Sequence, residues 1–311
     1  MRATAASGPS LALRRLRLYV SLVRYSRTHN RDFALEHSGF FASLLESLRR
    51  LGKDPRGLRV LDVGCGKSYW LTLLLHSYGA DVTGVDTELV RPGFSPGKYV
   101  AILGQNGADR ALRTLAWDLL FARPYYRALA RASPFALRFE GLDTRVAPDG
   151  RMDFPERSFD LIVSHEVFEH IRDVPAAARD LSRLLKPDGL TYIYVHNFAS
   201  LSGGHHIAWK YPDSEPSRVV PPWDHLREKR FPDIPSWLNA MREAEYREIF
   251  DRYFEVLQWI PSGREGEALL TPELRQELSG YSEAELLTKG FTIVARPKGR
   301  SASPAGGPLQ P

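Results

Sequence analysis

The stretch Val60-Leu61-Asp62-Val63-Gly64-Cys65-Gly66-Lys67-Ser68 decides the fold class. Its apolar start predicts a short buried strand over residues 58–63, and its two glycines predict a tight turn that opens a helix over 69–78. Glycine is used where the backbone must turn sharply or approach a ligand closely. Asp86 follows the second glycine by 20 residues, after a second predicted strand over 81–85. A carboxylate there can accept both ribose hydroxyls of an adenosine, so the pattern predicts a nucleotide-type cofactor.

The rest of the chain continues this alternation of strands and helices. We predict an α/β fold, a Rossmann-like doubly wound and mostly parallel sheet with N-terminal helices and inserted helical and loop segments. The last two strands are expected to supply an antiparallel C-terminal edge. The further predicted strands are 135–139, 159–164, 190–196, 254–260 and 290–295, and the further predicted helical segments are 174–185, 236–253 and 271–287.

The same pattern gives the expected domain organisation. Residues 1–52 form a basic N-terminal extension with helices at about 11–25 and 33–51. Residues 53–296 form the α/β domain, which carries insertions at about 91–134 and 197–233 because both segments exceed the length of an ordinary connection. The tail 297–311 is rich in Pro, Gly and Ser and is expected to be disordered.

Composition and charge narrow the classes of function. The single cysteine, Cys65, excludes an intrachain disulfide and a cysteine-based metal site. No apolar run is long enough to span a membrane, so the cytoplasm is the expected compartment. The net charge is +5, and residues 1–31 alone carry seven arginines and no acid, which leaves −2 for the remainder. This distribution disfavours a nucleic-acid partner. Residues 11–25 have three interpretations: a helix that packs over the cofactor, a peripheral membrane contact, and, least favoured, an RNA contact.

Two cofactor classes fit the glycine loop. A dinucleotide site needs a third glycine where this chain has Tyr69. The loop instead resembles the class I methyltransferase signature Val-Leu-Asp-x-Gly-x-Gly-x-Gly, with Ser68 in place of its last glycine. The resemblance implies S-adenosylmethionine (AdoMet) as cofactor. It implies that Asp62 holds the methionine ammonium and that an acid between Asp143 and Asp149 contacts the adenine. The cofactor-binding residues it implies are Asp62, Gly64, Cys65, Gly66, Asp86, Asp149 and Ser164.

A group of acids and histidines follows the predicted strand 159–164, in Ser164-His165-Glu166-Val167-Phe168-Glu169-His170. If a helix begins here, Glu166, Glu169 and His170 share one face at i, i+3 and i+4, a set suited to Mg²⁺, Mn²⁺ or Zn²⁺. The element resembles that of ubiquinone-pathway O-methyltransferases and small-RNA 2′-O-methyltransferases, where it binds a divalent ion. A further histidine then joins it, with His225 the first choice and His205 and His206 the alternatives. Without a metal, His170 or His165 would act as general base.

These observations predict a methyltransferase that methylates the hydroxyl of a small molecule or a glycan. The alternatives are an RNA 2′-O-methyltransferase, a nicotinamide-dependent oxidoreductase, and a non-catalytic AdoMet-binding protein. The insertion 197–233 carries Trp209, Tyr211 and Trp223 and is expected either to face the substrate or to anchor on the domain. The sequence does not decide the oligomeric state.

Overall fold

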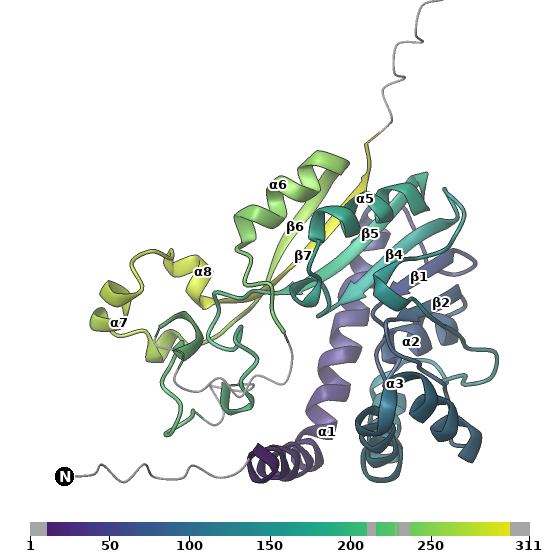
Figure 1. Cartoon of the computed structure of the whole chain (residues 1–311). Helices are drawn as coiled ribbons and strands as arrows, with labels where there is room; N and C mark the ends of the chain where they lie inside the picture. Colours follow the sequence, from purple (N-terminus) through teal and green to yellow (C-terminus); the bar gives the residue numbers. More distant parts are fainter. Residues whose placement is uncertain (1–10, 210–215, 228, 230–236, 299–311) are drawn as a thin grey trace, which may run out of the picture.

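The computed structural model describes residues 11–209, 216–227, 229 and 237–298, without the side chains of 11–19, 21–28, 149 and 207. Its centre is a seven-stranded sheet in the order β3-β2-β1-β4-β5-β7-β6 (Figure 1). The strands are β1 (Arg59–Val63), β2 (Asp81–Asp86), β3 (Asp143–Val146), β4 (Phe159–His165), β5 (Leu185–His196), β6 (Phe254–Arg264) and β7 (Thr288–Pro297). The helices are α1 (Leu11–Arg50), α2 (Trp70–Tyr78), α3 (Pro96–Trp117), α4 (Arg123–Ala132), α5 (Val174–Leu184), α6 (Glu243–Tyr253), α7 (Pro272–Glu277) and α8 (Glu283–Leu287).

The strand directions confirm the predicted fold class. Strands β1 to β5 are parallel, whereas β7 runs antiparallel to both β5 and β6. The antiparallel strand therefore lies one position in from the edge, and β6 forms the edge itself. A dinucleotide-binding Rossmann sheet has the order 3-2-1-4-5-6 without this inserted strand.

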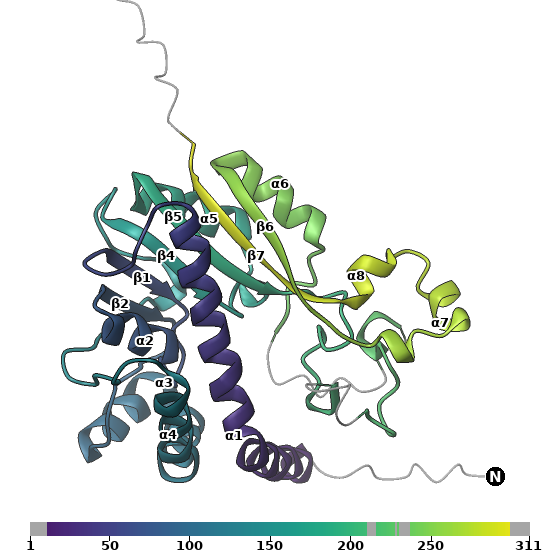
Figure 2. The same ribbon diagram turned by 180° about the vertical axis from the view of Figure 1, so that it is seen from behind.

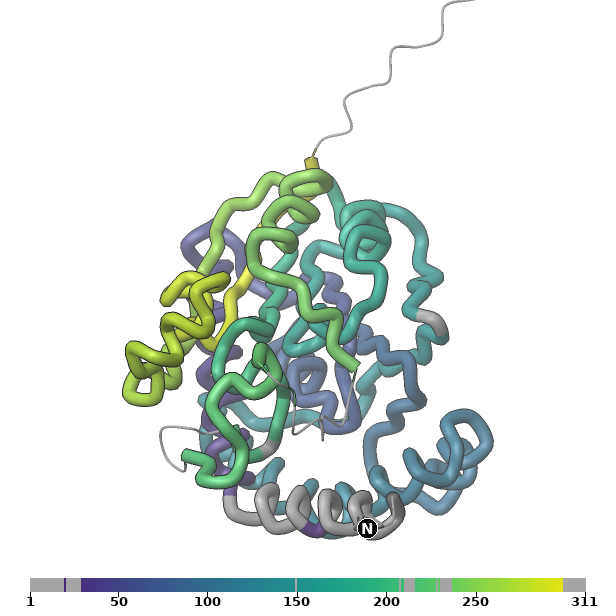
Figure 3. Tube along the Cα trace, turned by 60° about the vertical axis from the view of Figure 1, so that its left-hand side comes forward, coloured from purple at the N-terminus to yellow at the C-terminus, as the bar shows by residue number. Residues whose placement is uncertain are grey.

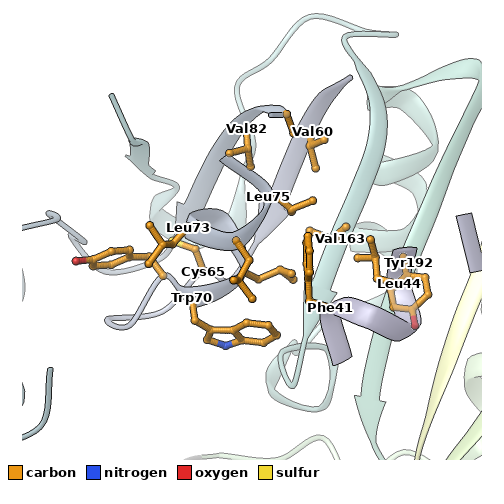
Figure 4. Close-up of a cluster of buried hydrophobic side chains, with 14 of the residues drawn as sticks. Phe41, Leu44, Val60, Cys65, Trp70, Leu73, Leu75, Val82, Val163 and Tyr192 are labelled. Carbon is orange, nitrogen blue, oxygen red and sulfur yellow. The ribbon is translucent and has the colours of Figure 1, made fainter. Parts of the chain in front are cut away.

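Helices cover both faces of the sheet, as Figures 1 and 2 show from opposite sides. One face packs against α1, α2 and α4, where Phe41, Leu44 and Trp70 meet the strand residues Val60 and Val163 (Figure 4). The other face packs against α5 and α6. Neighbouring strand residues point to opposite faces, so each strand contributes to both cores, and the nearly continuous apolar runs follow from this two-sided burial.

The prediction of a strand over 135–139 was wrong, because β3 lies at Asp143–Val146. The apolar residues of 135–139 pack over α2 instead: Phe135 contacts Tyr78, and the Arg138 amide donates to the Ser77 hydroxyl. The polar residues of β3 suit an edge strand, since Asp143 accepts a hydrogen bond from Thr83 on β2.

Helix boundaries differ from prediction at three places. The two predicted N-terminal helices are one helix, α1, because residues 26–32 contain no glycine or proline to interrupt it. Helix α6 begins at Glu243 rather than 236, and residue 236 lies outside the described residues. The predicted helical region 271–287 is two short helices, α7 and α8, each started by a capping hydroxyl from Thr271 or Ser282.

A separate small core lies beyond the end of the sheet. It joins the segment after β5 to α7 and α8, and it buries Trp209 and Trp223 among leucines. In Figure 3 the insertion containing α3 and the α7–α8 region lie on opposite sides of the molecule. Among the described residues, no helix has both the length and the apolarity to cross a membrane.

Candidate functional site

The glycine loop between β1 and α2 has the sharp turn that the sequence predicts. Gly64 and Gly66 both have positive φ, 77° and 62°. A side chain at Gly64 would meet Val167, since an added Cβ would lie 2.3 Å from its Cγ2. The Cys65 side chain is buried, and this burial raises the pKa of its thiol well above the usual value. Cys65 is therefore a packing residue, and its side chain lies in the core beneath the loop.

Asp86 is held against this loop at the end of β2. One of its carboxylate oxygens accepts a hydrogen bond from the Gly66 amide at 2.9 Å, and the other accepts one from the Glu88 amide. The two amides fix the carboxylate at the carboxyl end of the parallel strands, where open α/β sheets bind their ligands.

Asp62 lies on β1, two residues before Gly64, and is buried. Its side chain accepts a hydrogen bond from the Thr72 hydroxyl at 2.6 Å. Loss of contact with water raises the pKa of the Asp62 carboxyl to about 7, against an ordinary value of 3.8. A cationic partner at this position would reverse that penalty, as the ammonium of an amino-acid ligand could.

This burial makes a prediction for stability. Between pH 4 and pH 7 the folded state binds more protons at Asp62 than the unfolded state, so its contribution to the free energy of unfolding falls with rising pH and is constant above about 7. Well above pH 7, the burial of the ionised Asp62 carboxylate lowers the free energy of unfolding by about 4 kcal/mol, at about 1.4 kcal/mol per pKa unit. Asp62→Asn should therefore stabilise the ligand-free protein, and more so well above pH 7 than at about pH 5, in urea unfolding. The control is Asp81→Asn on the exposed start of β2; equal effects of both substitutions at both pH values would refute the prediction.

An open cleft of about 2060 Å³ joins the glycine loop to the segment after β4. Gly64, Gly66 and Asp86 line it together with Glu166 and His170. Ser164 does not reach into it, because its buried hydroxyl donates to the Val63 carbonyl and ties β4 to β1.

No α-helix begins directly after β4, so the condition under which Glu166, Glu169 and His170 would share a helical face is not met. Glu166 adopts the left-handed conformation, with φ 55°, and only a single 3-10 turn (Phe168–His170) follows. Non-glycine residues in this region cost free energy and are found most often at functional sites, where the surroundings hold them. The turn points Glu169 inward, where its side chain is 2% exposed.

Glu169 instead meets histidines from beyond β4. One ligand atom each from Glu169, His196 and His205 lie within 4.8 Å of one another. His205 Nε2 lies 3.9 Å from a Glu169 oxygen, and His196 Nδ1 lies 3.7 Å from a Glu166 oxygen. Burial raises the pKa of Glu169 well above its ordinary value, and the nearby Glu166 carboxylate adds to this rise. The cluster therefore offers oxygen and nitrogen atoms at the carboxyl ends of β4 and β5.

Comparison with known proteins identifies the family. A family model described as a methyltransferase domain matches residues 37–258, well over half of the chain. The chain belongs to the class I S-adenosylmethionine-dependent methyltransferases. Two ubiquinone biosynthesis O-methyltransferases are similar: that of Azorhizobium caulinodans is 30% identical over 167 residues, and that of Sinorhizobium fredii 27% identical over 154. These matches cover 54% and 48% of this chain but only 49% and 47% of the relatives, so the chain spans about half of their length.

Solved structures give weaker similarity. A methyltransferase from Mesorhizobium loti is 19% identical, with a TM-score of 0.44 over 81% of this chain and 96% of that one. A second, from Listeria monocytogenes and described as a putative AdoMet-dependent methyltransferase, is 13% identical, with a TM-score of 0.48 over 83% and 99%.

In this methyltransferase the structure separates the predicted site residues into two groups. Glu166 and Glu169 lie together and His170 is adjacent, with its ring centroid 5.1 Å from that of His205. His225 lies elsewhere: its Nε2 bonds the Phe198 carbonyl oxygen, and burial lowers its pKa to about 4. His165 packs between Phe40 and Tyr194 within an aromatic cluster.

The remaining predicted residues are the adenine-contacting acid and the aromatic residues of the insertion 197–233. Asp149 lies in a 3-10 turn (Pro148–Gly150) after β3, with its side chain outside the described residues. Trp209 and Trp223 are core residues and anchor their loop, whereas Tyr211 lies outside the described residues. The sequence reasoning missed His196, although it ends a predicted strand, the position at which parallel sheets place ligand-binding residues.

Proposed function

We propose that this methyltransferase transfers the AdoMet methyl group to a hydroxyl oxygen of a small molecule or a glycan. The observation that carries the proposal is the shared cleft, in which the glycine loop and Asp86 lie together with Glu166 and His170. The similar ubiquinone biosynthesis O-methyltransferases support it. Hydroxyl methylation requires removal of a proton, and this cluster supplies groups that can accept or stabilise the charge.

The cofactor residues have separate roles in this proposal. Asp86 accepts the ribose hydroxyls, and the backbone of Gly64–Gly66 passes over the methionyl part. Asp62 lies behind the loop and compensates the ammonium charge. Asp149 follows β3 and contacts the adenine. AdoMet carries the reactive group, so the chain contributes alignment and exclusion of water.

A divalent metal, Mg²⁺ or Mn²⁺, fits the cluster of Glu169, His196 and His205, with Glu166 and His170 adjacent. Neither oxygen of the Glu169 carboxyl accepts a hydrogen bond of ordinary geometry from the described residues, although the Glu169 and His196 backbone amides lie near it; this is unusual for a buried carboxyl. A mixed set of carboxylate and imidazole ligands suits such ions. When bound, the ion would lower the pKa of the acceptor hydroxyl and orient its oxygen. This ligand set replaces His225 with His196 and His205.

A buried chain of hydrogen bonds fixes the orientation of His196. The Ser202 hydroxyl donates to Glu265 at 2.8 Å, so its oxygen accepts from His196 Nε2, also at 2.8 Å. Nδ1 then keeps its lone pair and faces Glu166. A carboxylate that fixes the tautomer of a histidine in this way is typical of ligand and base sites.

His170 provides the route that needs no metal. Its Nδ1 donates to the Trp237 carbonyl oxygen at 2.8 Å, which leaves the lone pair on Nε2. His170 lines the cleft and can accept the hydroxyl proton directly. His165 is a weaker candidate because aromatic rings enclose it.

Ligand binding and methyl transfer test the proposal. AdoMet and S-adenosylhomocysteine should raise the melting temperature, whereas NAD and NADP should not, because ligands that bind only the folded state stabilise it. With methyl-labelled AdoMet, label should enter phenols, polyprenyl-linked glycans or other hydroxyl acceptors, and the product should resist the alkali that cleaves methyl esters. Transfer to amines alone, or to RNA 2′-hydroxyls alone, would contradict it.

We also propose that the enzyme acts in the cytoplasm and that residues 11–25 contact a membrane surface. The side chains that would make this contact lie almost entirely outside the described residues. Binding of anionic vesicles by the full chain is the measurement for it.

A further inference from the structure

The insertion between β2 and β3 exposes an unusual amount of apolar surface. Of the eleven large hydrophobic side chains that the structure describes as exposed, six lie in residues 91–134. They are Phe94 63%, Val100 69%, Leu103 51%, Leu112 67%, Leu119 62% and Leu120 49% exposed. Leu112 on α3 and Leu119 on the π-helical turn that continues it (Asp118–Ala122) are seven residues apart, so they lie near one side of this helical stretch. Exposed apolar groups concentrated on one element mark an interaction surface.

The insertion is a braced helical hairpin rather than a loose loop. Gly107, with φ 81°, breaks the helical conformation within α3 and reverses the chain. Lys98 before the break pairs with Asp118 after it at 2.7 Å, and both side chains are largely buried. Tyr99 also donates to Asp118. The hairpin therefore presents its exposed leucines on a rigid support.

The same hairpin is strongly basic. Residues 91–134 contain seven Lys and Arg but only two acids, which gives a net charge of +5. Both acids are already paired, Asp118 with Lys98 and Asp109 with Arg113. Arg123, Arg127 and Arg131 are exposed at i, i+4 and i+8 on α4, and no ion pair to them occurs within the described part of the chain.

A second basic segment, residues 1–31, includes the first part of helix α1, and a later part of α1 packs on α4. Helix α1 contacts α4 through a hydrogen bond between His37 Nδ1 and the Tyr125 hydroxyl, and through one from the Ser38 hydroxyl to the Ala132 carbonyl. Figure 2 shows α4 beside the lower part of α1. Residues 1–31, which lead into these turns of α1, carry +7. The two segments together hold +12, so the remainder of the chain carries −7.

We propose that the hairpin of residues 91–134 docks this enzyme on an anionic membrane surface. The leucines enter the boundary between headgroups and acyl chains, and Arg123, Arg127 and Arg131 contact lipid phosphates. A second copy fits less well, because a two-fold contact would place like charges against each other. RNA would account for the arginines but not for the exposed leucines. Docking does not depend on which acceptor the enzyme methylates.

Vesicle binding by the full chain tests this inference. Sedimentation would compare vesicles of phosphatidylcholine alone with vesicles of phosphatidylcholine and phosphatidylglycerol in equal amounts. We expect binding to the anionic vesicles only, with weaker binding at high salt. The variant Arg123→Gln/Arg127→Gln/Arg131→Gln should lower the partition coefficient at least tenfold. Leu112→Gln/Leu119→Gln/Leu120→Gln should lower it to a similar extent without changing the salt dependence.

A matched control removes three exposed arginines outside the hairpin, through Arg264→Gln/Arg275→Gln/Arg296→Gln, and should bind as the unmodified protein does. All variants should keep the thermal shift with AdoMet, which separates loss of docking from loss of folding or of the proposed function. Equal binding to both vesicle types overturns the inference, as does unchanged binding of both hairpin variants, which would assign any binding to residues 1–31. Absence of any vesicle binding also overturns the inference. The exposed leucines would then be assigned to a dimer contact, or the arginines to RNA binding.

Discussion

Asp86→Ala is expected to weaken the binding of S-adenosylhomocysteine at least about hundredfold, which corresponds to about 2.7 kcal/mol. In the proposed binding mode Asp86 accepts two hydrogen bonds from ribose hydroxyls, which the variant loses, and hydrogen bonds to charged groups contribute about 1.5–3 kcal/mol each. The substitution also frees the Gly66 amide, which donates to Asp86 at 2.9 Å, so the loop loses its support as well. Isothermal titration calorimetry measures the affinity, and the thermal shift with AdoMet should nearly disappear.

A second variant separates the two effects. Asp86→Asn keeps the size and one acceptor oxygen, so the loop should stay in place while the charge is lost, and the affinity should fall by an intermediate amount. Asp81→Ala changes an acid at the opposite end of the same strand, and it should bind the ligand normally. Normal affinity in Asp86→Ala would remove Asp86 from the cofactor site and with it the interpretation of the glycine loop.

Short, local patterns were sufficient to predict the centre of this fold. Val60 and Leu61 are both apolar because helices cover both faces of the sheet, and a glycine is needed at position 64 because Val167 lies against it. Both facts leave a direct trace in the sequence. The predicted strands at 58–63 and 81–85 consequently agree with β1 and β2 to within a residue.

The errors arose where distant contacts decide the conformation. The alternating Phe135, Leu137 and Phe139 have the pattern of a strand, but Phe135 and Leu137 pack into the core beside α2, and Phe139 contacts Tyr126 of α4. Likewise Glu166 adopts a left-handed backbone that no local signal indicated, so the expected helical face of acids did not form. The pairing of Glu169 with His196 and His205 depends on strand order and on a loop from beyond β5, and neither can be obtained from spacing along the chain.

The cluster of Glu169, His196 and His205 gives the second large expected effect. Glu169→Gln should lower kcat at least about hundredfold and should remove a bound divalent ion, because an amide is a much poorer ligand than a carboxylate. The two side chains have nearly the same volume, so the buried site should keep its packing, and the melting temperature measured in EDTA should not fall below that of the unmodified protein in EDTA. Elemental analysis of protein purified without chelators measures the ion, which should be close to one equivalent in the unmodified enzyme.

Neighbouring histidines provide the matched comparison. His205→Ala should lose the ion and most activity, whereas His206→Ala, one residue along the same loop, should retain both. The affinity for S-adenosylhomocysteine should stay near normal in each, since the proposed function assigns cofactor binding to the glycine loop and Asp86. If turnover is insensitive to EDTA and Glu169→Gln is mild while His170→Ala is inactive, the ion has no part in the reaction. The proton then leaves through His170, whose Nδ1 is already held by the Trp237 carbonyl so that its Nε2 is available to the substrate.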